Sequence, residues 1–100
     1  MEDIQYKIKA ELWEYPGKAA WHFITVPKNN SKEITELFGE AKRGWGSLPV
    51  NVIIGKSKWK TSIFPDKKTG TYLLPVKAEI RKSENIVAGD NVDVLINIII

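Results

Sequence analysis

The sequence predicts a mainly β protein: a small closed six-stranded β-barrel with one short α-helix. Apolar and polar residues alternate along several segments, which is the period of strands that bury one face. Only one segment has the i, i+3, i+4 spacing of an amphipathic helix. Six strands in 100 residues would leave exposed edges in an open sheet, and closing the sheet removes them. A chain of this length has room for a single domain, residues 1–100.

Six segments are predicted as strands because apolar side chains recur at every second position or in β-branched runs. They are residues 4–12, 19–26, 50–54, 58–64, 71–82 and 91–99. Pro16-Gly17 and Gly55-Lys56-Ser57 are typical of turns, and residues 65–70 are predicted as a loop. Pro75 inside the fifth segment indicates a sheet edge or a bulge, because proline has no N–H to donate. The sequence shows no internal repeat.

The single predicted helix lies between the second and third strands. Its expected buried stripe is Ile34, Leu37, Phe38 and Ala41. Asn30 or Ser31 would cap its start, because a short polar side chain can accept a hydrogen bond from the first turn. Gly44 would close its end.

Cysteine content and charge narrow the classes of function. The chain has no cysteine, which excludes disulfides, thiolate nucleophiles and cysteine-ligated zinc. The net charge is +3 and uneven, since residues 41–82 carry ten Lys and Arg residues against two acids. The first residues lack the pattern of a signal peptide, and the longest apolar run falls far short of the roughly 20 residues of a membrane helix. We therefore expect a cytoplasmic protein with no membrane segment.

An ordered set of short motifs resembles a known family. The motifs are Trp21-His-Phe-Ile-Thr-Val-Pro27, Gly44-Trp-Gly46, Ser62-Ile-Phe-Pro65, Gly70-Thr-Tyr-Leu-Leu-Pro-Val76, Arg81-Lys82 and Ala88-Gly-Asp-Asn-Val-Asp-Val94. Their order over nearly the whole chain resembles the family catalogued as domain of unknown function 1905. The resemblance implies a double-split β-barrel, a fold class that also contains bacterial transition-state regulators, which bind DNA as dimers. That family has no established activity, so the resemblance implies no catalytic residues.

A few residues are candidates for a binding pocket. Arg81 could grip a carboxylate or a phosphate with its planar guanidinium, and Ser62 and Tyr72 could line the same pocket at one end of the barrel. Trp45, between two glycines after the helix, is either a plug over the barrel end or a ligand contact. His22 is the only histidine and belongs to no metal motif, so we assign it a structural role. The sequence predicts no cofactor and no metal site.

Lysines dominate one face of the fourth predicted strand. Lys56, Lys58 and Lys60 recur at every second position, while Trp59 between them is predicted to face the core. Further basic residues follow in the next loop and on the fifth strand: Lys67, Lys68, Lys77 and Arg81. If the fourth and fifth strands pair, these side chains could form one basic surface for nucleic acid. The alternative is that the lysines keep the strands soluble and deter edge-to-edge association.

Three functions remain open from the sequence. The first is a non-catalytic module that binds a small anionic ligand or a protein partner, as a monomer or as a homodimer. The apolar residues Ile99 and Ile100 are expected to be tucked into a sheet or into a dimer interface. The second is nucleic-acid binding through the basic strand face. The third, ranked last, is an enzyme that uses Arg81, Ser62 and an acid in a small pocket.

Overall fold

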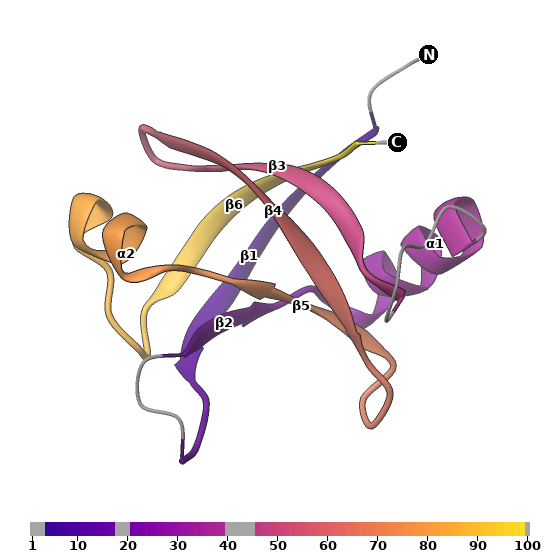
Figure 1. The fold of residues 1–100 in the computed structure, drawn as a ribbon, viewed down its shortest axis with the longest axis horizontal. Coiled ribbons are helices and arrows are strands. Elements are labelled where there is room, and N and C mark those ends of the chain that lie inside the picture. The colour runs from indigo at the N-terminus through magenta and orange to yellow at the C-terminus, as the bar shows by residue number, and fades with distance from the viewer. Residues whose placement is uncertain (1–3, 18–20, 40–45, 100) are drawn as a thin grey trace.

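Six antiparallel strands form a closed barrel with a helix at each of two opposite sides (Figure 1). The computed structural model describes residues 4–17, 21–39 and 46–99. The elements are β1 (Ile4–Glu14), β2 (His22–Thr25), α1 (Lys28–Phe38), β3 (Leu48–Ile54), β4 (Ser57–Asp66), β5 (Thr71–Pro75), α2 (Ala78–Glu84) and β6 (Asn91–Ile98). Around the barrel the strand order is β1-β2-β5-β4-β3-β6. The predicted closed six-stranded barrel is therefore confirmed, and the prediction of a single helix is wrong.

The two longest strands, β1 and β4, each belong to two sheets. β1 pairs with β6 over residues 4–11 and then with β2 over residues 12–14. In the same way, β4 pairs with β3 over residues 57–63 and then with β5 over residues 64–66. Where a strand passes from one sheet to the other, one of its edges loses its neighbour. The barrel therefore opens at two places, beside β1 and beside β4.

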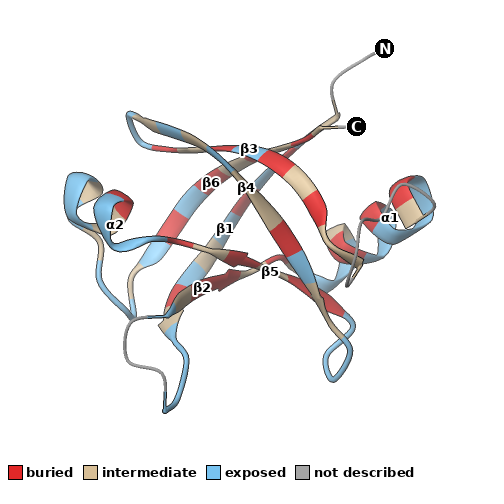
Figure 2. Cartoon of the chain, viewed as in Figure 1, coloured by how far each residue is buried: buried red, intermediate tan, exposed pale blue. Residues whose placement is uncertain are grey.

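The interior of the barrel is filled by the inward-facing residues of all six strands (Figure 2). Side chains that are almost fully inaccessible include Leu12, Ile24, Leu48, Ile63, Leu74 and Ile96. Burying each of these stabilises the fold by roughly 1.5–3 kcal/mol relative to exposure. The C-terminal isoleucines are part of this sheet, because Ile98 is buried and the Ile99 N–H donates to the Pro49 carbonyl at 2.9 Å. Ile100 lies outside the described residues.

The fifth predicted strand, residues 71–82, is in fact a short strand followed by a helix. β5 ends at Pro75, and α2 begins at Ala78. The alternation that suggested a strand is also compatible with one helical turn, and Ile80 is the side chain that α2 buries. Asn85 ends the helix with φ of 54°, and its N–H donates to the last carbonyls of the helix. A left-handed residue of this kind is a common helix stop, and asparagine tolerates it well.

Helix α1 starts earlier than the sequence predicts. Its first residue is Lys28, directly after Pro27, and neither Asn30 nor Ser31 caps it. Leu37, expected in the buried stripe, is 55 % exposed, whereas Ile34 and Phe38 are buried as predicted. The predicted end of the helix, from Ala41 to Gly44, lies outside the described residues.

Ser31 has a different task from the capping role that its position suggested. Its side chain is 1 % exposed. The hydroxyl donates to the Val26 carbonyl at 3.0 Å and accepts the Tyr72 N–H at 3.0 Å. Ser31 thereby joins the first turn of α1 to β5 and satisfies two backbone groups where the chain leaves β2.

The element order repeats a ββαβ unit twice, although the sequence shows no repeat. β1, β2, α1 and β3 are followed by β4, β5, α2 and β6. If β1, β2 and β3 trade places with β4, β5 and β6, every pair of neighbouring strands in the barrel stays a neighbouring pair. The barrel therefore has an approximate two-fold arrangement. The helices are fastened in matching ways: the Tyr6 hydroxyl of β1 donates to Glu33 of α1 at 3.0 Å, and the Ser57 hydroxyl of β4 donates to Glu84 of α2 at 2.6 Å.

The β3–β4 connection is a two-residue hairpin. Ile54 pairs with Ser57, which leaves Gly55 and Lys56 as the loop. Gly55 has φ of 58°, and a side chain at this position would collide with the Glu84 carboxylate. A positive φ at the first loop residue alone is typical of a type II′ turn, which requires glycine there. The predicted turn is confirmed, except that Ser57 already belongs to β4.

Tyr6 carries a shifted pKa because of its contact with α1. Burial, and then the hydrogen bond to Glu33 and the charge of Glu33, raise the pKa of Tyr6 from 10.0 to about 12. The folded protein therefore holds the phenolic proton more tightly than the unfolded chain. The resulting stability is fully present below pH 10, and it is lost as the pH rises towards 12.

Substituting Tyr6→Phe should remove this alkaline dependence. We expect the free energy of unfolding of the wild-type protein to fall more steeply between pH 10 and 12 than that of the variant. Urea unfolding at a series of alkaline pH values measures both slopes. Parallel curves for the two proteins would show that Tyr6 does not carry this proton linkage.

Candidate anion-binding pocket

A pocket of about 340 Å³ opens where β4 and β5 part. It lies between the middle of β4, the end of β5, the start of α2 and the residues at the start of β2. Its lining residues are Trp21, His22, Trp59, Lys60, Thr61, Pro75, Val76, Lys77, Ala78 and Arg81. Figure 1 shows β4 and β5 diverging towards α2, which places this pocket at one of the two openings of the barrel.

Arg81 is held in place by contacts with the end of β5 and the start of β2. Its Nε donates to the Val76 carbonyl at 3.2 Å, and its Nη1 lies 3.5 Å from Nε2 of His22. A guanidinium can only donate, so this contact is a hydrogen bond only when Nε2 of His22 accepts. Nδ1 of His22 is buried and has no hydrogen-bond partner among the described residues.

The charged side chains that line the pocket are all basic among the described residues. They are Lys60, Lys77 and Arg81. Lys77 also lies 3.5 Å from Glu79, but both side chains are more than half exposed, and an exposed pair of this kind contributes little. Basic side chains around a concave site with low-dielectric walls raise the local concentration of anions.

Two tryptophans flank the basic groups. Trp21 is 55 % exposed and stacks on Phe23, with ring centroids 5.9 Å apart and 28° between the planes. Trp59 is on the inward face of β4, as predicted, but it is only partly buried and packs against the edge of the core. A ligand in this pocket would therefore meet aromatic surface as well as positive charge.

The first half of the barrel shares two of these hydrogen bonds and has no cation at the position that matches Arg81. The matching pairs are Val26 and Val76, Ser31 and Arg81, and Tyr72 and His22, each separated by 50 positions. Ser31 donates to the Val26 carbonyl just as Arg81 donates to the Val76 carbonyl. The backbone bonds also match, since Val26 N–H donates to Tyr72 and Val76 N–H donates to His22, both at 2.9 Å. The two halves thus bond the matching valine carbonyl with different side chains: a neutral hydroxyl in the first half and a charged guanidinium in the second.

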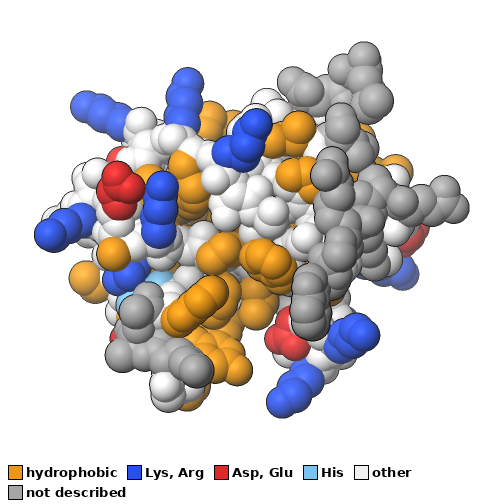
Figure 3. Space-filling model, viewed as in Figure 1, with side chains coloured by type: hydrophobic (Ala, Val, Ile, Leu, Met, Phe, Trp, Pro, Cys, Tyr) orange, Lys and Arg blue, Asp and Glu red, His pale blue; other side chains and the backbone are white. Residues whose placement is uncertain are grey.

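The aromatic side of the pocket continues onto the outer face of the barrel. Ring contacts join Trp13, Tyr15, Trp21 and Phe23. Nε1 of Trp13 donates to the Thr25 hydroxyl at 2.9 Å, which fixes its indole on this face. Figure 3 shows apolar side chains gathered in the lower part of the view, over β2 and β5, with most of the lysines and arginines to their left.

A second hollow, of about 390 Å³, lies on the other side of β4. It occupies the outer face of the β1-β6-β3-β4 sheet, where Gln5, Asn97, Asn51 and Lys60 are paired in one row across the four strands. Lys58 lines only this hollow, whereas Lys60 and Trp59 line both. β4 is thus the wall between the two hollows.

Comparison with known proteins places the chain in a family. The family model described as domain of unknown function (DUF1905) matches residues 9–96. The chain belongs to the DUF1905 family. The match confirms the resemblance seen in the motif order, and it includes every residue that lines the pocket around Arg81. No curated protein matches this DUF1905 chain.

The described part of the DUF1905 chain contains neither a metal-binding cluster of side chains nor a membrane-spanning helix. Within residues 4–17, 21–39 and 46–99, no group of three or more His, Cys, Asp or Glu side chains is placed to hold a metal ion. In the same ranges, none of the helices has the length and apolar character needed to cross a membrane.

The structure separates the residues that the sequence grouped around Arg81. Arg81 lines the pocket, but Ser62 and Tyr72 do not. Ser62 follows Lys60 on the outer face of β4 and pairs with Pro49. Tyr72 points into the core and is 2 % exposed. The serine and the arginine of the enzyme hypothesis are therefore not brought together, and Trp45 lies outside the described residues.

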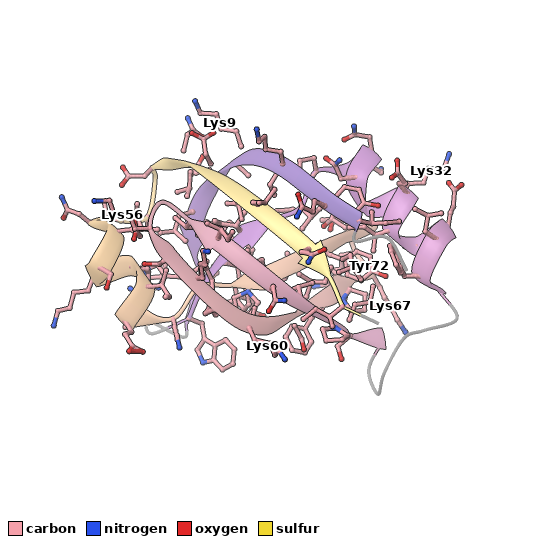
Figure 4. The ribbon with its side chains drawn as sticks, turned by 90° about the horizontal axis from the view of Figure 1, so that it is seen from above. Lys9, Lys32, Lys56, Lys60, Lys67 and Tyr72 are labelled. Carbon is pink, nitrogen blue, oxygen red and sulfur yellow. The ribbon has the colours of Figure 1, made fainter. Side chains whose placement is uncertain are left out.

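The basic residues of the DUF1905 domain are spread along the barrel and do not share one strand face. Lys58 and Lys60 are exposed on the outer face of β4, and Lys56 is exposed in the hairpin loop. Figure 4 shows Lys56 and Lys67 towards opposite ends of the barrel, with Lys60 between them. β4 and β5 do pair, but only over residues 64–66 and 71–73. The prediction that Lys77 and Arg81 lie on one strand face is wrong, because β5 ends at Pro75, Lys77 precedes α2 and Arg81 belongs to it.

Several residues that line the pocket are not singled out as its members by the sequence. The sequence assigns His22 a structural role, does not single out Trp21, and includes Lys77 only in a basic strand surface. One signal was available: Pro75 is followed by Ala78, Glu79 and other good helix formers, which is a pattern that ends a strand and starts a helix. Finding α2 would have moved Arg81 to the opening beside β4.

Substituting Tyr72→Phe should test whether Tyr72 has a binding role. Its hydroxyl is buried with no hydrogen-bond partner among the described residues, and a buried unsatisfied hydroxyl costs free energy. We expect the variant to be as stable as the wild type or about 1 kcal/mol more stable, with ligand binding unchanged. Thermal unfolding checks the first expectation. A clear loss of stability would reveal a partner for this hydroxyl.

Proposed function

We propose that this DUF1905 domain is a non-catalytic binding module that holds a small anionic ligand in the pocket between β4 and β5. The observation that carries the proposal is the replacement of Ser31 in one half by Arg81 in the other, within a shared hydrogen-bond arrangement. In the first half, this position holds a hydroxyl that joins α1 to β5. The second half opens a pocket there and adds a guanidinium.

The chemistry of the pocket suits a planar carboxylate or a similar anion. Arg81 and Lys60 supply charge from two sides, and charge-assisted hydrogen bonds are about twice as strong as neutral ones. Trp21 and Trp59 offer ring faces for an aromatic or apolar portion of the ligand. We therefore expect aromatic carboxylates to bind better than inorganic phosphate.

Benzoate and benzamide form a matched pair of test ligands, because they share a shape and differ in charge. We expect benzoate to bind at least ten times more tightly than benzamide, as measured by NMR titration of the wild-type domain. Equal binding of the two compounds would show that the basic groups do not select the ligand.

Two lysines provide a matched pair of variants. Lys77 lines only the pocket around Arg81, and Lys58 lines only the outer hollow. Lys77→Gln should weaken benzoate binding about two- to fivefold, which is the size expected for one partly screened charge. Lys58→Gln removes the same charge from a residue that does not line this pocket, and it should leave the affinity unchanged. A larger effect of Lys58→Gln would place the anion in the outer hollow.

A second candidate is single-stranded nucleic acid on the outer face of β4. Lys58 and Lys60 alternate there beside the in-register amides of Asn51 and Asn97. Backbone phosphates would release counterions, so the affinity would fall steeply with salt. Titration with a short oligothymidylate at low and at physiological salt tests this candidate. A lack of binding at low salt would remove it.

A further inference from the structure

β4 has an edge without a strand partner beside the pocket. Residues 57–63 pair with β3 on one side, and only residues 64–66 pair with β5 on the other. Among the described residues, no other strand pairs with residues 58–62. This open edge is about 17 Å long, at roughly 3.4 Å per residue.

The hairpin register shows which backbone groups face the open edge. Ile54 and Ser57 flank a two-residue loop, so they form a hydrogen-bonded pair, and every second pair beyond them does the same. The residues between those pairs turn their N–H and C=O groups away from β3. These are Lys58, Lys60 and Ser62. The next residue in this series, Phe64, faces the same way and pairs with Leu73 of β5.

Pro75 is unable to extend the β4–β5 ladder along this edge. Continuing the β4–β5 register by two residues would place Pro75 opposite Ser62. Proline has no N–H, so it cannot continue the ladder at that position. The chain then leaves the sheet and begins α2 at Ala78. The backbone N–H and C=O groups of Lys60 therefore face the pocket. Pro75 and Ala78 line the opposite side of that pocket.

The two openings of the barrel differ in how well they are covered. Beside β1, the inward-facing Tyr6 and Ile8 are 6 % and 5 % exposed, and α1 has 11 residues. Beside β4, the inward-facing Trp59 and Thr61 remain half-buried, and α2 has only 7 residues. A pocket is found at the opening beside β4, where Trp59 and Thr61 are less deeply buried than Tyr6 and Ile8.

We infer that the pocket accepts an extended acidic peptide segment, which adds to the open edge of β4 as an antiparallel strand. This inference rests on the proposed anion-binding function and names the class of its ligand. Every strand pair of the barrel is antiparallel, and strand addition to a free edge is a common mode of peptide recognition.

The alternation of side chains along β4 defines the peptide. Its residues on the outer face lie beside Lys58 and Lys60, so they should be acidic, and those on the inner face lie beside Trp59, so they should be apolar. A peptide residue that forms backbone hydrogen bonds with Lys60 has its side chain on the same face of the sheet as Lys60. The backbone N–H groups that bond to β4 therefore belong to the acidic residues.

Three peptides test this arrangement. The first is acetyl-Glu-Val-Glu-Val-Glu-amide. The second carries a methyl group on the backbone nitrogen of the central glutamate, which removes an N–H that bonds to β4. The third carries the methyl group on a neighbouring valine, whose N–H points away from β4, and it serves as the matched control. Binding is measured by calorimetry and by displacement of benzoate.

We expect the unmodified peptide to displace benzoate, the glutamate-methylated peptide to bind at least ten times more weakly, and the valine-methylated peptide to bind within about threefold. Equal binding of the unmodified and glutamate-methylated peptides would overturn strand addition. Benzoate binding without any peptide binding would also overturn it, while leaving the proposed function in place. Failure of both ligands would contradict both proposals.

Discussion

Substituting Ser31→Ala is expected to lower the free energy of unfolding by about 2–4 kcal/mol, because two buried backbone groups lose their partner at once. The Val26 carbonyl loses its donor and the Tyr72 N–H loses its acceptor. Ser31 is almost fully buried, so water cannot easily replace the hydroxyl. For a domain of this size, the loss corresponds to a decrease in Tm of roughly 10–20 °C.

Thermal and urea unfolding of the Ser31→Ala protein measure this loss. Ser83→Ala is a suitable control, because Ser83 is exposed on α2 and its substitution should change stability by less than about 0.5 kcal/mol. A Ser31→Ala protein as stable as the control would mean that the hydroxyl is not needed to join α1 to β5.

Substituting Arg81→Ser should abolish anion binding while leaving the barrel folded. Serine at the matching position of the first half makes the equivalent bond to the Val26 carbonyl, so a hydroxyl can occupy this place in the fold. We expect benzoate to bind at least ten times more weakly, which corresponds to the loss of one or two charge-assisted hydrogen bonds. The free energy of unfolding should fall by about 1 kcal/mol or less.

Affinity and stability must be measured on the same Arg81→Ser preparation, by NMR titration and by urea unfolding. A folded variant that binds benzoate as the wild type does would remove Arg81 from the site. Arg81→Lys separates charge from shape, because a lysine keeps the charge but lacks the planar fork. We expect Arg81→Lys to retain part of the affinity.

Most of the barrel could be predicted from local alternation, because a strand with one buried face has a period of two. β1 and β6 have an almost unbroken pattern, and both were predicted within two residues of their ends. α2 was missed for a specific reason. Residues 71–80 place apolar side chains at every second position, and that pattern hid a strand of five residues followed by a helix of seven.

The pocket could not be predicted from the sequence, because it depends on where two strands stop pairing. Arg81 was recognised by its chemistry alone, and its neighbours were wrong: Tyr72 belongs to the core, and Ser62 lies on the outer face of β4. The relation between Ser31 and Arg81 is equally invisible in the sequence, since the two ββαβ units share few identical residues. It becomes evident only through the matching hydrogen bonds.

The most direct test of the central claim is a two-dimensional NMR titration of the assigned domain with benzoate. The account predicts that the indole N–H signals of Trp21 and Trp59 and the backbone signals of His22 and Arg81 shift together with one dissociation constant. The signals of Asn51 and Leu95, which line the outer hollow and not the pocket around Arg81, should stay in place. Shifts confined to the outer hollow, or no shifts up to the solubility limit of benzoate, would contradict an anion-binding pocket between β4 and β5.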